Sequence, residues 1–464
     1  MKTAALGTGS ASLSSVSPAH YGEAHERIVA PGRTHDRSFR LTEAIAALRR
    51  VVYPDLTFEI CRSLDPVLGP WQEFEKHAAA TLFQNSLWCR AWLETAGTAL
   101  NAQPRIVLGR DAEGRLQFIL PMQIRRRQGV RVLEWLGSPH HNYGYGLYGP
   151  VFLPQARQWF DRNWSLLLNS IGGFDAISLS ENPQRMFGCE NPLATHFNMR
   201  GANPSFAFAL DADFAALQAA KHSSGKRRSA RKSEKGLAQA GTVGFGLPGS
   251  KQELHALIAT MFRHQQARLA ELGIHHLFGT VERQFIHHLA ELQDETDPLL
   301  APYHLTHDGE VLAVMLGGLH GNRYWALISS LAPGPQRKHS PGDVALRRTI
   351  AACCERGLES VDLSAGEAPY KRQWADETIE LSTILRAVNP AGLAWTIAAA
   401  IHLAVKRAIK RAPALLLGWT MLRRFFLGTP AKKRFDGRST EHRLPGPPNA
   451  IAGGGKGPTA PAVG

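Results

Sequence analysis

The chain has 464 residues and a formal net charge of +14, with 44% hydrophobic and 20% charged residues. This length is enough for two or three domains, and the composition is that of a globular protein rather than a fibrous or disordered one. The excess of lysine and arginine favours an anionic partner, which leaves nucleic acid, a membrane surface and a phosphorylated cofactor open.

The sequence lacks the usual features of a secreted, membrane-spanning or metal-binding protein. Its first residues have no apolar core of a secretion signal, and no run reaches the ~20 apolar residues of a membrane span. Neither metal-ligand spacing nor a disulfide framework is present among the cysteines, which are Cys61, Cys89, Cys189, Cys353 and Cys354. We therefore expect a cytoplasmic protein without a metal cofactor.

The first half of the chain has the pattern of an α/β unit. Residues 1–52 are rich in Ser, Gly, Ala and His, so we expect them to be mostly disordered. The elements expected after them are a strand at 56–60, an aromatic helical region at 71–92, a hairpin around 111–114, a strand at 131–135, a helix at 158–171 and a strand at 176–179.

A glycine-rich loop at 137–150 follows the strand at 131–135. It carries His140, His141, Asn142 and Tyr143 without an acidic neighbour and without the spacing of metal ligands. We expect this loop to line a substrate site rather than to bind a metal ion.

The second half repeats the plan of the first. Residues 173–180 and 357–364 each place a glycine after an apolar helix, then a short strand, then a serine. The fold class predicted from this repeat is α/β (α+β), with two tandem units that each contain a mixed sheet flanked by helices. We place the units at 53–202 and 203–390.

A basic segment, Lys221–Lys235, lies early in the second unit. It contains seven Lys/Arg and one acid, with a spacing that gives one helix a strongly basic face. Such a face is usually only solvated, and contact with phosphate or nucleic acid remains open. The next helix, at 251–273, carries His264 and Arg268 on one side, and a lone helical histidine is more often structural than catalytic.

The segment 331–350 has the composition of an anion site. Three basic residues, Arg337 to His339, precede Ser340-Pro341-Gly342, where a helix begins. Free backbone N–H groups and the positive end of a helix favour a bound anion. An ordinary helix cap explains the Ser-Pro-Gly as well, but the basic residues favour pyrophosphate binding.

The segment 357–375 has the composition of a reaction centre. A strand at 360–363, which contains Asp362, ends in the turn Ser364-Ala365-Gly366. An acid, a phenol, an amine and an indole follow within a few residues, namely Glu367, Tyr370, Lys371 and Trp374. Open sheets bind ligands at the carboxyl ends of their strands, although a solvated loop anchored by Trp374 is the simpler interpretation.

The C-terminal part has a different composition. Residues 391–435 contain nine Lys/Arg and no acid, and 391–428 is expected to form amphipathic basic helices. These helices fit an anionic membrane surface, and equally a helix pair packed on the second unit. Residues 429–464 are rich in Gly and Pro, so we expect a disordered tail.

The order of these motifs resembles a known family. The loop ending in His339-Ser340-Pro341-Gly342, the apolar helix after it, and the series Gly366-Glu367-x-x-Tyr370-Lys371-x-x-Trp374 look like the CelD-like (BioF-type) branch of the GNAT acetyltransferases. The resemblance covers roughly residues 56–387. The sequence resembles more distantly the Fem-type peptidyltransferases, which also carry tandem GNAT units.

This resemblance implies an acyltransferase that uses acetyl-CoA or another acyl-CoA as its co-substrate. The acceptor would be an amine or hydroxyl of a small molecule or of a sugar or envelope precursor, in polysaccharide or cell-envelope biosynthesis. The loop before the long second-unit helix would bind the pantetheine and pyrophosphate, through Gln336, Arg337, Lys338, His339, Ser340 and Gly342. The first unit, which has no such basic loop, would be a non-catalytic copy that shapes the substrate site.

The resemblance also gives roles to the residues of the reaction centre. The candidates for the general base are Glu367 and Asp362, with His264 behind them. Tyr370 would protonate the departing thiolate, and Lys371 would bind an anionic substrate group or the oxyanion.

Two other functions remain open at this point. The basic segment and the net charge also fit a Fem-type transferase that takes an aminoacyl group from tRNA. The basic C-terminal helices also fit a non-catalytic, membrane-peripheral subunit of a polysaccharide synthesis complex. In either case we expect a cytoplasmic protein, with 391–428 as its contact to the inner face of the membrane.

Overall fold

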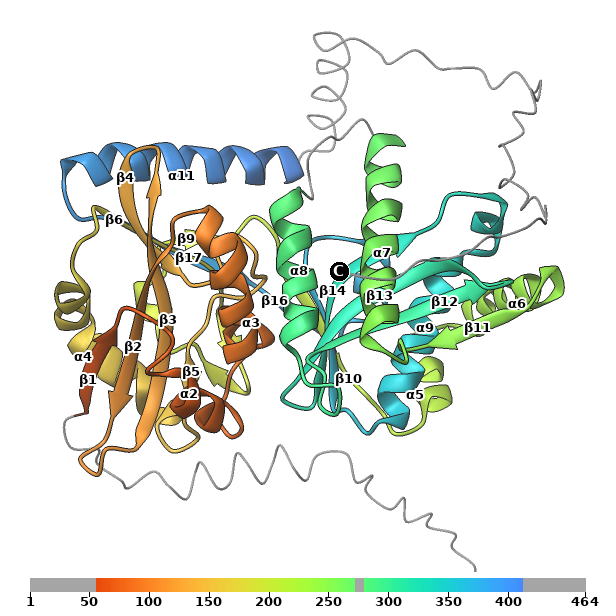
Figure 1. The fold of residues 1–464 in the computed structure, drawn as a ribbon, viewed down its shortest axis with the longest axis horizontal. Coiled ribbons are helices and arrows are strands. Elements are labelled where there is room, and N and C mark those ends of the chain that lie inside the picture. The colour runs from red at the N-terminus through yellow and green to blue at the C-terminus, as the bar shows by residue number, and fades with distance from the viewer. Residues whose placement is uncertain (1–55, 272–278, 412–464) are drawn as a thin grey trace, which may run out of the picture. The chain divides into compact units, whose positions relative to one another are not determined.

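The computed structural model describes residues 56–271 and 279–411, which form two mixed sheets flanked by helices (Figure 1). The expected tandem α/β architecture is therefore confirmed. The first sheet contains, in spatial order, β1 (Thr57–Cys61), β2 (Gln103–Arg110), β3 (Leu116–Arg127), β4 (Val130–Trp135), β6 (Ala176–Pro183), β17 (Leu381–Ala387) and β9 (Met199–Arg200), with β5 (Leu147–Tyr148) beside β3.

The second sheet has the same plan. In spatial order it contains β11 (Val243–Gly246), β12 (Leu300–His307), β13 (Glu310–His320), β14 (Arg323–Leu331), β15 (Ser360–Ala365), β10 (Ser205–Ala209) and β16 (Glu377–Ile379). In both sheets the fourth and fifth strands run parallel, while their other neighbours are antiparallel. A small hairpin, β7 (Arg185–Met186) with β8 (Cys189–Glu190), stands apart.

The helices of the described residues cover both sheets. They are α2 (Leu68–Glu75), α3 (Ser86–Trp92), α4 (Leu153–Ile171), α5 (Phe214–Lys221), α6 (Ser224–Ala240), α7 (Lys251–Glu271), α8 (Thr280–Leu292), α9 (Pro341–Glu355), α10 (Pro369–Trp374) and α11 (Pro390–Arg411). Short turns of helix lie at η1 (Leu82–Gln84), η2 (Leu93–Gly97), η3 (Ala194–His196) and η4 (Pro335–His339).

Glycines end the helix that precedes the fifth strand of each sheet. Gly173 follows α4 with φ 75°, and Gly357 follows α9 with φ 70°. Backbone in this region is available to glycine at little steric cost. These two glycines therefore turn the chain from helix to strand at the same place in the two units, as the repeat in the sequence predicts.

The second sheet is covered on both faces, because side chains alternate along its strands. On β13, Ala313 and Met315 belong to a core shared with α5, α6 and α9. Their neighbours Val314 and Leu316 belong to a larger core that also contains α7, α8 and the first unit. The carboxyl ends of β14 and β15 therefore lie between two packed layers.

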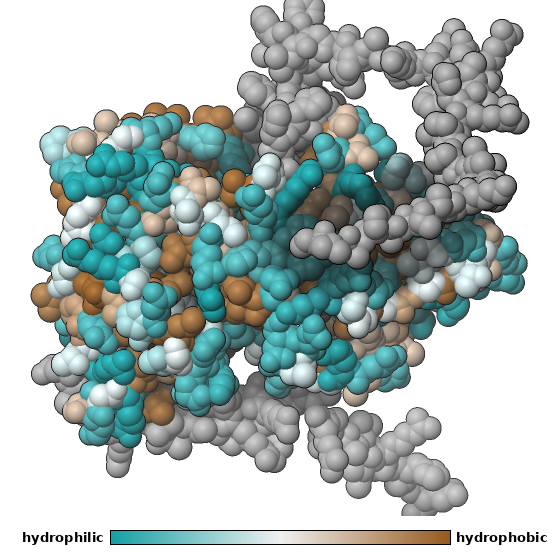
Figure 2. All heavy atoms as spheres, viewed as in Figure 1, coloured by the Kyte–Doolittle hydropathy of each residue, from teal (hydrophilic) through white to brown (hydrophobic). Residues whose placement is uncertain are grey.

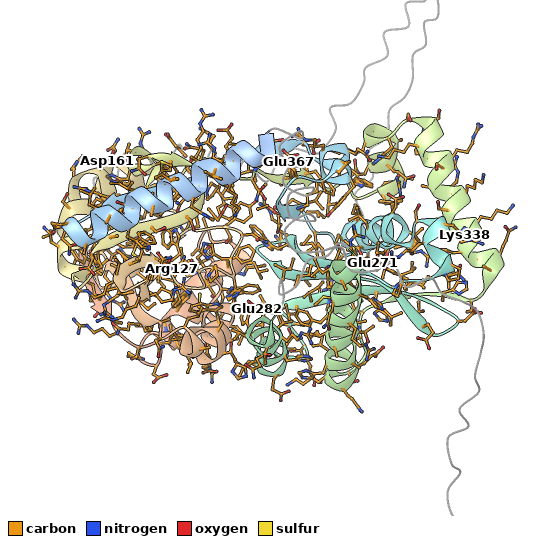
Figure 3. The ribbon with its side chains drawn as sticks, turned by 90° about the horizontal axis from the view of Figure 1, so that it is seen from above. Arg127, Asp161, Glu271, Glu282, Lys338 and Glu367 are labelled. Atoms are coloured by element: carbon orange, nitrogen blue, oxygen red, sulfur yellow. The ribbon has the colours of Figure 1, made fainter. Side chains whose placement is uncertain are left out.

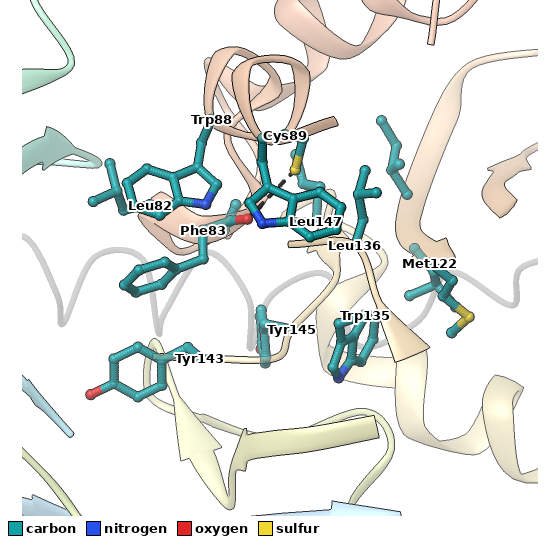
Figure 4. Close-up of a cluster of buried hydrophobic side chains, with 14 of the residues drawn as sticks. Leu82, Phe83, Trp88, Cys89, Met122, Trp135, Leu136, Tyr143, Tyr145 and Leu147 are labelled. Atoms are coloured by element: carbon teal, nitrogen blue, oxygen red, sulfur yellow. Dashed lines mark hydrogen bonds between the residues drawn. The ribbon is translucent and has the colours of Figure 1, made fainter. Parts of the chain in front are cut away.

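The two units share this larger core. Trp88 on α3 packs edge-on against Phe285 on α8, with ring centroids 5.0 Å apart. Phe83 in turn contacts Trp325 on β14 at 6.3 Å. Figure 4 shows the surrounding cluster of the first unit, with Tyr143 at its edge and the hydroxyl pointing out of the cluster.

The two sheets exchange their sixth strands, and one of these strands, β17, lies outside the sheet that the expected division at residues 202 and 203 assigns to it. β17 lies in the range assigned to the second unit, but it pairs with β6 from Leu381↔Pro183 to Ala387↔Ala176. β10 follows the first unit directly and pairs with β15 and β16 of the second sheet. The sequence repeat could not reveal this exchange, because local pattern does not specify which sheet a strand joins.

Helix α11 packs on the first unit (Figures 1 and 3). One of the two expectations for the C-terminal helices was that they pack on the second unit instead. Asn389 donates a 2.7 Å hydrogen bond from Nδ2 to Asp175 Oδ1, and Val388 N donates to Asp175 O at 2.9 Å. The helix follows β17, so the exchange of this strand also carries α11 to the first sheet. Among the described residues, no helix is long and apolar enough to cross a membrane.

Several expectations fall outside the described residues. They are the expected disorder of residues 1–52, the expected continuation of the basic helices at 412–428, and the expected disordered tail at 429–464.

The strand exchange and the shared core predict that neither unit folds alone. A fragment of residues 56–202 lacks β17, and a fragment of residues 203–411 keeps all strands of the second sheet but loses the first unit's part of the shared core and leaves β17 unpaired. Each fragment expressed alone should give an unfolded or aggregated product in circular dichroism and gel filtration, because an unpaired strand edge or the apolar face of the shared core is exposed. Co-expression of the two should recover a folded complex. A cooperative thermal transition in either isolated fragment would contradict this prediction.

Candidate functional site

A cavity lies where the two central parallel strands of the second sheet part. β14 and β15 pair only at Arg323↔Ser360, Tyr324↔Val361 and Trp325↔Asp362. Beyond these pairs the strands diverge around a cavity of ≈110 Å³. Its lining consists of Asn142, Met315, Leu316, Ala326, Leu327, Ile328, Ser329, Leu363, Ser364, Ala365, Tyr370 and Lys371.

A bulge in β14 lies at this point. The ladder with β13 shifts register between Leu316↔Ile328 and Gly317↔Ala326, so that Leu327 is the extra residue. The extra residue of a bulge stands outside the regular ladder. Leu327 lines the cavity, so the bulge places backbone polar groups beside it that the ladder does not use.

Ser364 fixes the end of β15 on the other side of the cavity. Its backbone is left-handed, with φ 62°, a conformation that is uncommon for residues other than glycine. Its hydroxyl donates to Ala326 O on β14 and so bridges the two strands where they part. The Asp362 carboxylate accepts the Ser364 N–H at 2.7 Å, which holds the turn from within.

Lys371 is the buried amine of the site. Its Nζ donates 3.0 Å hydrogen bonds to the carbonyl oxygens of Ser364 and Ala365. Burial lowers the pKa of Lys371 to about 8, and the negative charges of Asp362 and Glu367 oppose this change. The amine therefore exchanges its proton close to neutral pH. A neutral amine has two N–H donors and one lone pair, so the two carbonyls would use both donors and leave the lone pair free.

Asp362 lies behind the cavity and is fully buried. Its Oδ2 accepts a 2.8 Å hydrogen bond from the hydroxyl of Tyr143, and Arg323 Nη1 lies 3.9 Å away. Burial raises the pKa of Asp362 to about 6, although Arg323 and the hydrogen bonds oppose this rise. The carboxyl group does not line the cavity, so it positions the turn after β15 rather than facing a ligand.

Tyr143 takes part in this network through a contact with Asp362 that the sequence did not predict. It comes from the loop at 137–150 of the first unit, and its hydrogen bond to Asp362 connects the two units across the core. The neighbouring residue, Asn142, lines the cavity. The loop that was expected to line a substrate site therefore reaches the cavity of the second unit. Glycines on both sides of these residues were the available signal, since they let the loop approach other backbone closely.

Tyr370 completes the cavity wall from the first turn of α10. Its side chain is partly buried and its pKa is raised by burial. The hydroxyl therefore stays protonated at neutral pH. Three of the expected catalytic residues, Asp362, Tyr370 and Lys371, are thus brought together, two of them at the cavity and one behind it.

Glu367 and His264 lie elsewhere. The Glu367 carboxylate pairs with Arg372 at 2.6 and 2.9 Å in an exposed position, and Figure 3 shows it well apart from Lys338. His264 is half-buried on α7, and burial together with Arg263 and Arg337 lowers its pKa. Neither side chain lines the cavity.

The expected anion-binding residues lie in η4 and at the start of α9. Lys338 is exposed, while Arg337 donates from Nε to Ala332 O and forms a 3.1 Å ion pair with Glu271. The Nη2 atom of Arg337 is buried without a hydrogen-bond partner among the described residues. The remaining members, Gln336, His339, Ser340 and Gly342, continue this turn into the helix.

The first turn of α9 offers fewer free N–H groups than the sequence suggested. Pro341 has none, and the N–H groups of Asp343 and Val344 both donate to Ser340 O. An anion bound here would therefore depend mainly on the side chains of Arg337 and Lys338. Among the described residues, no group of three or more His, Cys, Asp or Glu side chains could hold a metal ion.

The equivalent place in the first sheet is closed. β4 and β6 also pair in parallel only briefly, at Val132↔Ala176 and Leu133↔Ile177. The loop at 137–150 enters the gap, where Gly144 N donates to Glu181 O at 2.9 Å. A Cβ at Gly144 would come within 2.3 Å of the Trp135 ring, so this loop fills the space tightly. The ladder of β3 with β4 has no bulge.

Asp362 should make the protein less stable as the pH rises from about 4 to about 6. The folded state keeps the proton of this carboxyl up to about 6, against an ordinary pKa of 3.8, so it binds more protons than the unfolded chain in this window. The stabilisation is full below pH 4 and is lost through pH 6, by on the order of 3 kcal/mol. Urea unfolding of the wild type and of Asp362→Asn from pH 4 to 7 measures this change.

The free energy of unfolding of the wild type should fall relative to that of Asp362→Asn over this window, because asparagine has no proton to release. A difference that stays constant from pH 4 to 7 would show that Asp362 is already ionised at pH 4.

One family model matches part of this chain, and several solved structures resemble it. Residues 224–372 match the family described as "Acetyltransferase (GNAT) domain". No curated protein gives a significant sequence match. Similar solved structures include FemX (10% identity, 71% of this chain and 97% of that chain, TM-score 0.48), L-PGS from Bacillus licheniformis (10%, 73% and 98%, 0.44) and a tandem GNAT protein from the clavulanic acid biosynthesis pathway (9%, 72% and 99%, 0.38). The family match thus identifies residues 224–372 as a GNAT-type acetyltransferase domain.

Proposed function

We propose that the protein is an acyltransferase that moves an acyl group from acetyl-CoA or another acyl-CoA to an amine or hydroxyl. The observation that carries this proposal is the cavity between β14 and β15, whose wall holds Tyr370 and Lys371. An acyl thioester in this cavity would extend away along the strands toward η4. Arg337 and Lys338 would there meet the phosphates of the donor.

The bulge at Leu327 supports the placement of the thioester. A backbone N–H outside the ladder can donate to the thioester oxygen, which becomes negatively charged as the acceptor attacks. The N–H belongs to the backbone of a half-buried strand, so it needs little reorganisation during the reaction. Its role is therefore to stabilise the tetrahedral intermediate.

Lys371 is the proposed general base. In its neutral form its two N–H groups donate to Ser364 O and Ala365 O, and its lone pair accepts the proton of the acceptor amine or hydroxyl. The acceptor nitrogen or oxygen then bonds to the acyl carbon. This assignment replaces Glu367, which is held at the surface by Arg372.

Tyr370 is the proposed general acid. The carbon–sulfur bond of the tetrahedral intermediate breaks, the carbonyl re-forms, and the departing thiolate takes the proton of the Tyr370 hydroxyl. Lys371 then returns its proton to solvent, and Tyr370 regains one. Asp362 does not touch the reacting groups and acts as a positioning residue for the turn that holds Lys371.

The first unit serves the second without its own reaction. Its gap between β4 and β6 is filled by the loop at 137–150, and Asn142 of that loop reaches the cavity of the second unit. We assign to this loop the selection of the acceptor. The resemblance of residues 366–374 to the CelD-like branch is the support for an acceptor from polysaccharide or cell-envelope biosynthesis.

An aminoacyl-tRNA donor is the second candidate. The observation that favours it is the exposed basic face of α6, formed by Arg228, Arg231, Lys232 and Lys235. Clustered exposed cations are typical of contact with a nucleic-acid backbone. The same cavity would then receive the aminoacyl end of the tRNA in place of a thioester.

Isothermal calorimetry with acetyl-CoA and longer acyl-CoAs tests the donor. We expect micromolar binding to the wild type and a loss of at least tenfold in Arg337→Ala/Lys338→Ala, because two phosphate contacts are removed. The control is Arg162→Ala/Arg185→Ala, which removes the same charge from two exposed arginines of the first unit and should bind normally.

Equal weakening in both double variants would mean that the effect is one of net charge alone. Absence of binding by any acyl-CoA would overturn the proposed donor. If the protein then binds aminoacyl-tRNA, and if replacing the basic residues of α6 by acidic ones abolishes this binding, the second candidate is supported. If the protein transfers a group from neither donor, a non-catalytic role is favoured.

The pH dependence of turnover tests the assignment of Lys371. The value of kcat/KM should rise with pH to a plateau above about 8, because the base must be neutral and its pKa is about 8. Lys371→Met and Lys371→Arg should lose roughly 10²- to 10⁴-fold in rate, the usual contribution of a general base. Glu367→Ala should keep both the rate and the pH profile. If instead Glu367→Ala abolishes turnover and Lys371→Arg retains it, the assigned roles are wrong.

A further inference from the structure

Helix α11 presents an apolar face to its surroundings. Leu393, Ile397, Ile401 and Val405 are 53%, 53%, 59% and 50% exposed, and they follow one another at intervals of four residues. Between residues 391 and 405 the helix has no Asp, Glu, Lys or Arg, and the exposed positions between these four side chains are Ala394, Ala398, His402 and Ala404. A helix on the surface of a soluble protein normally carries polar residues on its outer side.

The packing of α11 prevents a rotation that would hide this face. Gly392 lies directly on the first unit, where a Cβ would come within 1.8 Å of Asp175 O. The Gly392 N–H donates to Asn389 Oδ1, and Asn389 in turn donates to Asp175. Thr396, one turn further along, is buried on the same side. The stripe from Leu393 to Val405 is therefore held outward, and Figure 2 shows hydrophobic surface along the edge where α11 lies.

Charge indicates what covers this face. The helix contains no acid, and Lys406 and Arg407 follow the apolar stripe directly. In the printed sequence the next acid is Asp436, after seven more Lys/Arg. A second copy of this helix would offer no acid to these cations, whereas an anionic lipid surface would offer one at every headgroup.

We propose that the outer face of α11 lies flat on an anionic lipid bilayer. The apolar stripe extends over about 18 Å along the helix and would enter the boundary between headgroups and acyl chains, with the cations beside the lipid phosphates. No described helix can span a membrane, so the contact is peripheral. This proposal does not depend on the identity of the acyl donor.

Vesicle co-sedimentation of the full chain tests the proposal. The probes are vesicles of phosphatidylcholine alone and vesicles with about 30% phosphatidylglycerol, whose anionic headgroups attract basic segments. Ile401→Glu should lower the partition coefficient on the anionic vesicles at least tenfold. The matched control is Leu166→Glu on α4, because Leu166 is 57% exposed against 59% for Ile401, and it should change binding less than twofold.

Both substitutions lower the net charge equally and affect exposed side chains, so equal thermal unfolding curves should confirm that both variants fold. Unchanged binding of Ile401→Glu would overturn the proposal, since the contact would then lie elsewhere in the chain. Equal binding to neutral and anionic vesicles would overturn the role of charge. Light scattering without lipid completes the test: a dimer that Ile401→Glu converts to a monomer would identify a second copy as the occupant.

Discussion

The short pairing of β14 with β15 is the constraint on which the candidate site depends. Three residue pairs hold the strands together, and the hydroxyl of Ser364 bridges them once more before they part. Everything in the site follows from this opening: the bulge at Leu327 on one side, and the turn that holds Lys371 on the other. Because the opening lies between two packed layers, polar groups at its wall are partly desolvated, which shifts the pKa of each titratable side chain there.

Both sheets have a short parallel pair of strands, but the space where these strands part is open in one unit and filled in the other. In the second, the parted strands leave a cavity, and in the first a glycine-rich loop fills the same place. That loop then contributes Tyr143 and Asn142 to the second unit, so closing one opening supplies a wall and a hydrogen-bond donor to the other. A duplicated fold has in this way become a single site with two unequal halves.

Much of the fold could be predicted from the sequence, and less of the site. The glycines at 173 and 357, the hairpins and the alternation of side chains are local signals, and each gave the correct element. The partner of β17 is not a local property, so the sequence could not place this strand in the first sheet. For the same reason Lys371 and Tyr370 could be singled out by composition, whereas the pairing of Glu367 with Arg372 and the reach of Tyr143 to Asp362 depend on tertiary contacts.

The exchange of β10 and β17 has a consequence for biosynthesis. As the chain leaves the ribosome, β6 and β9 emerge long before β17, the strand that belongs between them, and β10 emerges long before β15. Neither sheet can be completed until the end of α10 has been made, so the nascent first unit exposes strand edges during synthesis of the second. Such long-range pairings slow folding. The protein should therefore depend on chaperones during translation more than a chain of two independent domains of the same length.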